Sequence, residues 1–167
     1  MRRCVKVLAA LVVTVGLSSA AFAQSAADVR RQQALADKGN PQAQTWMGYR
    51  YETGTGGIRQ DEREAARLYR LAADKGFAQA QNNLGWFYHI GKGGLVRDDV
   101  EALRLFRLAA DRGNDFALNN LGLFYEMGHG GLARDDRGAA KYYKLAADKG
   151  NPHALASALA KISNAAH

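Results

Sequence analysis

The sequence predicts an all-α fold, a solenoid of about eight helices arranged as antiparallel pairs. The main observation is a motif that occurs three times without interruption, at residues 40–76, 77–113 and 114–150. Each copy contains two segments of helical length, separated by a glycine-rich turn. A fixed period of this length is typical of solenoids, in which every unit buries its apolar face against its neighbours. The chain is therefore expected to be a stack of repeats rather than a globule around one central core.

Residues 1–23 have the features of a secretory signal peptide. A basic start precedes an almost wholly apolar run from Val5 to Leu17, and small residues stand at Ala21 and Ala23. This order predicts cleavage between Ala23 and Gln24. The apolar run is shorter than the roughly 20 residues that a membrane-spanning helix needs, so cleavage is favoured over an uncleaved anchor. The mature protein is expected to be periplasmic or secreted, without stable insertion in a membrane.

Removal of the signal peptide changes the charge and the chemistry of the chain. The full sequence has a formal net charge of +7, and the loss of Arg2, Arg3 and Lys6 lowers it to +4. Because acidic and basic residues are mixed along the helices, this modest charge argues against a nucleic-acid partner. The single cysteine, Cys4, leaves with the signal peptide. The mature chain is therefore expected to have no disulfide, thiol nucleophile or thiolate metal ligand.

Residues 24–39 are predicted to form an N-terminal capping helix. Ser25 is a good N-cap, Asp28 completes a pair like a capping box, and Gly39 ends the helix. The closing letters ALADKG match the end of each later repeat. The mature chain therefore begins with the second helix of a repeat, which is the usual form of a terminal cap.

The first helix of each repeat carries a stripe of small or apolar residues at intervals of four, which places them on one helical face. The stripe consists of Ala43, Met47 and Tyr51, then Ala80, Leu84 and Tyr88, then Ala117, Leu121 and Tyr125. Gly48, Gly85 and Gly122 follow at a helix-interior position where glycine costs roughly 1 kcal/mol relative to alanine. Their recurrence predicts close approach of the paired helix.

The glycine-rich segments 54–57, 91–94 and 128–131 are interpreted as turns. A phosphate-binding loop would need a preceding strand and a lysine–serine pair, and both are missing. The second helices are expected to begin at Asp61, Asp98 and Asp135 as N-caps. Glu64 and Glu101 are in place to complete capping boxes.

The buried face of the second helices is predicted from its alanines and one aromatic residue. Its members are Ala65, Tyr69, Ala72 and Ala73, then Ala102, Phe106, Ala109 and Ala110, then Ala139, Tyr143, Ala146 and Ala147. Gly76, Gly113 and Gly150 are expected as left-handed C-caps. Residues 151–167 are predicted to form a C-terminal capping helix and tail, with Pro152 near the helix start.

These motifs closely resemble those of the Sel-one-like repeat family, a relative of the tetratricopeptide repeat. The shared pattern is alanine, leucine–glycine, tyrosine, a glycine-rich turn, aspartate, alanine, an aromatic residue and a closing Ala-Ala-acidic-x-Gly. The resemblance covers residues 40–162, with Met47 in place of leucine in the first repeat. It implies a right-handed α-solenoid and a role as an adaptor or scaffold, often in the bacterial envelope. It identifies no partner, because family members share a framework rather than a ligand.

A second face of the first helices is predicted to form a protein-binding groove. Offsets of four and seven stay on one side of a helix, and these positions lie opposite the stripe. They are Thr45, Tyr49 and Glu52 in the first repeat, Asn82, Trp86 and His89 in the second, and Asn119, Leu123 and Glu126 in the third. The resemblance implies that the first helices line the concave surface. We therefore expect this set to bind an extended peptide or a helix of a partner protein in the cell envelope.

Trp86 has two interpretations at this stage. A tryptophan that points away from the core suits an interaction anchor, but the ring could equally pack on neighbouring helices. Asn83 and Asn120 have an intermediate position on the helix. For them a structural hydrogen bond to the adjacent repeat is favoured over a peptide clamp.

The sequence favours a binding protein over an enzyme. His89 lies between Glu52 and Glu126 in repeat phase, but packed helices are about 8–10 Å apart, so these residues form a ladder rather than a metal shell. The mature chain contains neither Ser-x-x-Lys nor Gly-x-Ser-x-Gly. We expect no catalytic residue, metal or cofactor. One alternative is a cell-wall-directed protein that binds or hydrolyses β-lactams or peptidoglycan, and another is a self-associating structural module.

Overall fold

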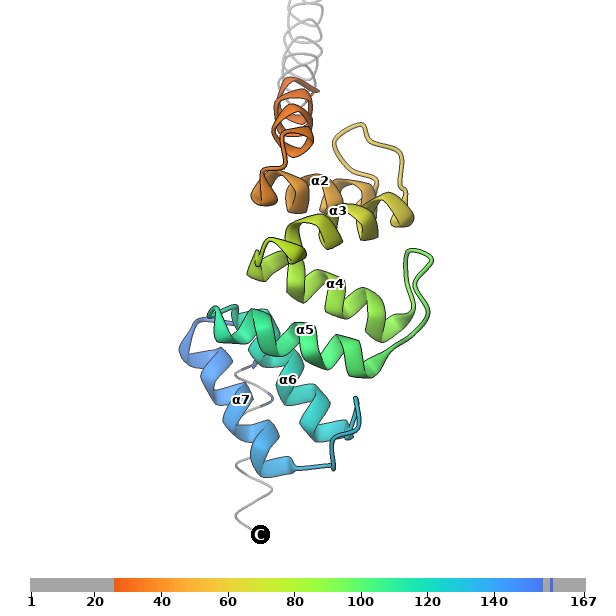
Figure 1. Cartoon of the computed structure of the whole chain (residues 1–167). Helices are drawn as coiled ribbons and strands as arrows, with labels where there is room; N and C mark the ends of the chain where they lie inside the picture. The colour runs from red at the N-terminus through yellow and green to blue at the C-terminus, as the bar shows by residue number, and fades with distance from the viewer. Residues whose placement is uncertain (1–25, 155–156, 158–167) are drawn as a thin grey trace, which may run out of the picture.

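The computed structural model describes residues 26–154 and 157, and these residues form helices and turns without a strand (Figure 1). Residues 26–37 are helical, and six helices of equal length follow. They are α2 (Pro41–Thr53), α3 (Glu62–Asp74), α4 (Ala78–Ile90), α5 (Asp99–Asp111), α6 (Asp115–Met127) and α7 (Asp136–Asp148). The all-α solenoid predicted from the sequence is confirmed. The predicted signal peptide, Ser25 and residues 158–167 lie outside the described residues.

The helices pack as three antiparallel pairs, α2 with α3, α4 with α5, and α6 with α7. Successive pairs are joined by contacts of α3 with α4 and of α5 with α6, while α2 also touches α4. Figure 1 shows the pairs stacked along one direction, with the N-terminal helix at one end. Among the described residues, no helix combines the length and apolar character that crossing a membrane requires.

The second helix of each repeat begins at an aspartate, as predicted. The Oδ1 atoms of Asp61, Asp98 and Asp135 accept hydrogen bonds from the backbone N–H groups two and three residues later. These bonds satisfy donors that the helix start leaves without intrahelical partners.

The capping boxes predicted at Glu64 and Glu101 are only half formed, and this expectation was wrong. The two glutamates bind Arg67 and Arg104 on the next turn instead of reaching back to the N-cap. The reason lies in the preceding helix, because the N–H of Asp61 already donates to the carbonyl of Tyr51 at 2.9 Å. The first helix of the repeat therefore takes the place of the glutamate.

The recurrent helix-interior glycines mark close helix contacts, as predicted. A Cβ on Gly48 would lie 2.7 Å from the Tyr69 ring, and one on Gly85 would lie 2.9 Å from the Phe106 ring. At Gly122 the corresponding distance to Tyr143 is 2.6 Å. Carbon atoms do not approach this closely without displacement. The aromatic ring of the second helix therefore occupies space that is free only because the first helix has a glycine there.

The glycine-rich turns hold one repeat against the previous one. Gly93 and Gly130 have φ of +66°, and a Cβ there would lie 2.5 Å from the carbonyl oxygen of Glu62 and 2.6 Å from that of Asp99. Each turn therefore lies on the first residue of the second helix in the preceding repeat. The closing residues Gly76, Gly113 and Gly150 also have positive φ, as expected.

The core follows the predicted faces, with one difference. The alanines and the Met or Leu of the first-helix stripe are buried, but Tyr51, Tyr88 and Tyr125 are only half-buried. On the second helices Ala110 and Ala147 are also half-buried. At the C-terminal end, Asn151 is buried and accepts hydrogen bonds from the N–H groups of His153 and Ala154.

Candidate functional site

The candidate site is a hollow of about 400 Å³ on the side of the solenoid formed by α2, α4 and α6. We call it the amide hollow, because five of its lining residues carry side-chain amides. Its lining consists of Tyr49, Glu52, Gln79, Asn82, Asn83, Trp86, Phe87, Phe116, Asn119, Asn120 and His153. Because residues of α2, α4 and α6 all line it, the hollow crosses the three repeats.

Three aromatic side chains at the amide hollow remain accessible. Tyr49 is 53% exposed, Trp86 is 38% exposed and Phe116 is 43% exposed. Tyr49 and Trp86 were predicted here. Trp86 combines features of both interpretations, since its side chain is partly exposed like an anchor and its ring also packs on the His89 ring, with 5.3 Å between centroids. Phe116 was missed. It occupies the repeat position of Gln42 and Gln79, and a comparison between the copies at that position would have singled it out.

The amides form a connected network across the floor of the hollow. The Nδ2 of Asn120 on α6 donates to the Oδ1 of Asn82 on α4 at 2.9 Å. Asn82 and Gln79 both donate to the Oδ1 of Asn83, at 3.3 and 3.0 Å. The structural interpretation is therefore right for Asn120, which links two repeats. Asn83 accepts within its own helix and also hydrogen-bonds the Tyr69 hydroxyl of the preceding repeat. The Oδ1 of Asn119 is buried and has no hydrogen-bond partner among the described residues.

Glu52 does not leave a free charge in the amide hollow. Its carboxylate accepts a hydrogen bond from the Tyr69 hydroxyl at 2.8 Å and pairs with the ammonium of Lys92 at 3.1 Å. Burial raises the pKa of Tyr69, and the neighbouring Glu52 raises it further. Glu52 is therefore paired rather than free, although Lys92 also contacts Glu62 at 3.4 Å, and the hollow offers mainly apolar faces and neutral amides.

The remaining predicted residues are placed differently. Asn82 lines the amide hollow but is only 7% exposed, and Thr45, which lies outside the lining, is 6% exposed, so the expected exposure of these two side chains is not found. The Thr45 hydroxyl donates to the carbonyl of Pro41 at 2.8 Å. Leu123 and Glu126 are half-buried and lie outside the lining of the amide hollow. Glu126 instead accepts a hydrogen bond from the Tyr143 hydroxyl at 2.7 Å.

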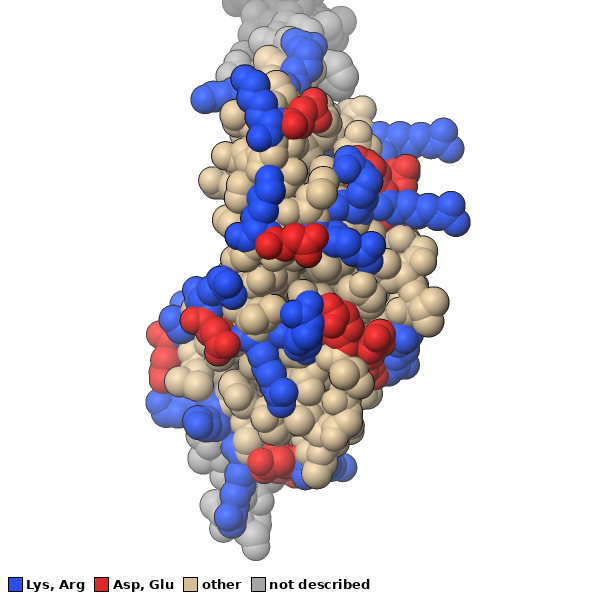
Figure 2. All heavy atoms as spheres, viewed as in Figure 1, with Lys and Arg blue, Asp and Glu red and all other residues tan. Residues whose placement is uncertain are grey.

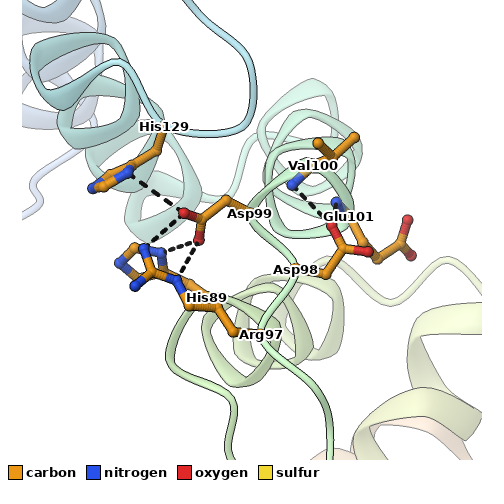
Figure 3. A network of polar contacts seen from close by, with 7 residues as sticks. All are labelled: His89, Arg97, Asp98, Asp99, Val100, Glu101 and His129. Carbon is orange, nitrogen blue, oxygen red and sulfur yellow. Dashed lines mark hydrogen bonds and ion pairs between the residues drawn. The ribbon is translucent and has the colours of Figure 1, made fainter.

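His89 also faces away from the amide hollow. Its Nδ1 lies 2.7 Å from the Oδ1 of Asp99, and its ring packs on Phe124 at 5.0 Å between centroids (Figure 3). Glu52, His89 and Glu126 thus bind separate partners. In the part of the chain that the structure describes, no three His, Cys, Asp or Glu residues are grouped as metal ligands.

The outer charges are mixed in sign. Figure 2 shows basic and acidic side chains interspersed over the visible face. Several of them pair locally, as in Arg67 with Glu64, Arg104 with Glu101 and Lys144 with Asp148. Exposed pairs of this kind contribute little to stability. They also leave no broad field of one sign on the visible face.

Comparison with protein families finds three matches to the Sel1 repeat, at residues 41–77, 78–114 and 115–151. The chain belongs to the Sel1 repeat family. The matched repeats have the period predicted from the sequence and begin one residue later than the predicted boundaries. A comparison with curated proteins finds no match.

Two solved structures resemble this Sel1 repeat chain. One is a Sel1 repeat protein from Oxalobacter formigenes, with 35% identity and a TM-score of 0.67, over 79% of this chain and 97% of that protein. The other is a protective antigen of uropathogenic Escherichia coli strains displaying an SLR fold, with 39% identity and a TM-score of 0.66. That match covers 72% of this chain, which spans only 25% of the antigen.

Proposed function

We propose that this Sel1 repeat protein is an exported adaptor or scaffold that binds a partner protein or peptide of the cell envelope in the amide hollow. The observation that carries the proposal is the combination of three exposed aromatic side chains with neutral amides in one hollow. Large aromatic side chains dominate the binding energy of protein interfaces. A family whose members typically serve as protein-interaction scaffolds supports the same reading.

The chemistry of the hollow favours an uncharged segment of the partner. Tyr49, Trp86 and Phe116 offer apolar faces to its side chains, while the amides of Asn83 and Asn120 supply donors and acceptors for backbone groups. Because Glu52 is already paired with Lys92, a charged partner would gain little here. Recognition would then depend on shape and apolar contact more than on charge.

Site-specific photo-crosslinking in cells tests this proposal. A photoreactive amino acid replaces Tyr49 at the amide hollow, and in a matched chain it replaces Leu71 on α3, which is also exposed. We expect one discrete crosslinked protein from position 49 and none of that mass from position 71. Equal crosslinking from the two positions, or none from position 49, would contradict the proposal. Mass spectrometry of the adduct identifies the partner segment.

A further inference from the structure

The two junctions between successive repeats are built from the same three positions but with different chemistry. At the first junction, Lys92 in the turn of the second repeat contacts Glu52 at 3.1 Å and Glu62 at 3.4 Å. One repeat later, the equivalent positions hold His129, His89 and Asp99. One lysine that is charged at all physiological pH values and contacts two carboxylates is thus replaced by two imidazoles that share one carboxylate.

The second junction is a compact cluster from three separate segments (Figure 3). The Nδ1 of His89 on α4 lies 2.7 Å from the Oδ1 of Asp99 on α5, and the Nδ1 of His129 lies 3.5 Å from its Oδ2. The two imidazole rings are 5.1 Å apart, and both pack on the ring of Phe124. The side chains of His89, Asp99 and His129 are only 13%, 20% and 31% exposed, so water screens their charges incompletely.

Arg97 already neutralises Asp99. Its Nη2 lies 2.8 Å from the Oδ2, and its Nε lies 3.4 Å from the Oδ1. Burial by itself would raise the pKa of Asp99, but the hydrogen bonds from Arg97 and His89 outweigh it and lower this pKa. The adjacent Asp98 points to the other side, toward the N–H groups of Val100 and Glu101. On α6, the carboxylate of Glu126 is held by Tyr143.

The charge balance therefore depends on how many imidazoles are protonated. An imidazole in water is half protonated at about pH 6.5. One protonated imidazole adds an ion pair with Asp99. When both are protonated, three cations, counting Arg97, surround the same carboxylate. The attraction of His129 to Asp99 across 3.5 Å is then opposed by repulsion from the other imidazolium ring and from Arg97.

We propose that His89, Asp99 and His129 form a pH-sensitive joint between the second and third repeats, which is closed while at most one imidazole is protonated and loosens when both are. The first junction, with Lys92, lacks this response because its cation does not titrate in mild acid. The proposal does not depend on any ligand of the amide hollow.

Hydrogen–deuterium exchange of the purified protein at pH 7.5 and pH 5.0 tests the joint, after correction for the intrinsic effect of pH on exchange. Amide protection at a junction reports its local opening. We expect protection at residues 95–100 and 128–131 to fall about tenfold in acid relative to residues 58–63 and 91–94, a difference equivalent to about 1.4 kcal/mol. An equal change at both junctions, or no change at the second, would overturn the proposal.

Two variants separate the joint from a general effect of acid. In His129→Gln the second proton has no site, so the acid response of the second junction should disappear. In His153→Gln, which removes an exposed histidine outside the cluster, the response should remain. A His129→Gln protein that keeps the full response would sink the proposal. Because the wild-type comparison of the two junctions needs no variant, it decides the question even if His129→Gln folds poorly.

Discussion

Gly85 illustrates how single residues set the spacing of this solenoid. The glycine lies inside α4, where it weakens the helix, yet the Phe106 ring on α5 occupies the space that a side chain would need. The same arrangement joins Gly48 with Tyr69 and Gly122 with Tyr143. The contact was predictable from the sequence, because a helix-interior glycine at the same phase in three repeats indicates close packing.

We expect Gly85→Ala to lower the free energy of unfolding by about 1–3 kcal/mol, because overpacking outweighs the gain in helix propensity. Urea denaturation followed by circular dichroism measures the change. The double variant Gly85→Ala with Phe106→Leu provides the control, since the smaller side chain makes room for the new methyl group and should recover part of the loss. A neutral or stabilising Gly85→Ala would refute the close contact.

The buried tyrosine hydroxyls predict a dependence on alkaline pH. Burial raises the pKa of Tyr143 above its ordinary value, and the hydrogen bond to Glu126 raises it further. A raised pKa in the folded state gives stability that is complete below about pH 10 and is lost as the pH rises through the folded-state pKa. The stability advantage of the wild type over Tyr143→Phe should therefore narrow above about pH 10. A constant difference between pH 8 and pH 11, in urea unfolding, would contradict this assignment.

At the scale of the element, the starts and ends of the helices were the most predictable features. The aspartate N-caps and closing glycines depend on local backbone chemistry, which the sequence contains. The capping boxes failed because Asp61 and Asp98 donate their N–H groups to the carbonyls of Tyr51 and Tyr88 in the preceding helix. That contact joins two helices and is not visible in the sequence around the cap.

Two substitutions at the start of α5 compare the aspartate N-cap, which is formed, with the glutamate of the capping box, which is not. Asp98→Ala removes the N-cap and should cost about 1 kcal/mol of unfolding free energy. Glu101→Ala should cost less than about 0.5 kcal/mol, because the glutamate only pairs with exposed Arg104. Thermal denaturation of both variants gives the comparison. Equal losses would show that Glu101 has a capping role after all.

The candidate site was less predictable than the fold, and the reason is geometric. Helical spacing gives the direction of a side chain but not what the neighbouring repeat covers. Thr45 and Asn82 are buried although helical spacing placed them on the open face, and Asn82 is held by Asn120 of the next repeat. His89 on α4 contacts Asp99 on α5, and the turn between these helices brings the two residues together. The pattern within either helix therefore does not indicate the contact.

At the scale of the whole molecule, each pair of helices contacts mainly its neighbours. The residues that stabilise these contacts can therefore be distinguished from the residues available for binding. The framework residues recur in every repeat, whereas Tyr49, Trp86 and Leu123 differ at one repeat position. Of these, the first two line the amide hollow, and Phe116 joins them from α6. Substitution of an exposed residue of this kind should affect binding more than folding.

The central claim is tested most directly by a binding measurement. The partner identified by crosslinking at position 49 is titrated against the wild-type protein and against the Trp86→Ala variant. The matched control is Leu71→Ala on α3, because Trp86 and Leu71 are equally exposed at 38%. We expect Trp86→Ala to weaken binding at least about thirtyfold, the loss of about 2 kcal/mol typical of an aromatic anchor, with unchanged helicity and cooperative melting. Leu71→Ala should bind like the wild type. Unchanged affinity in Trp86→Ala, or an equal loss in Leu71→Ala, would contradict the assignment of the amide hollow as the binding surface.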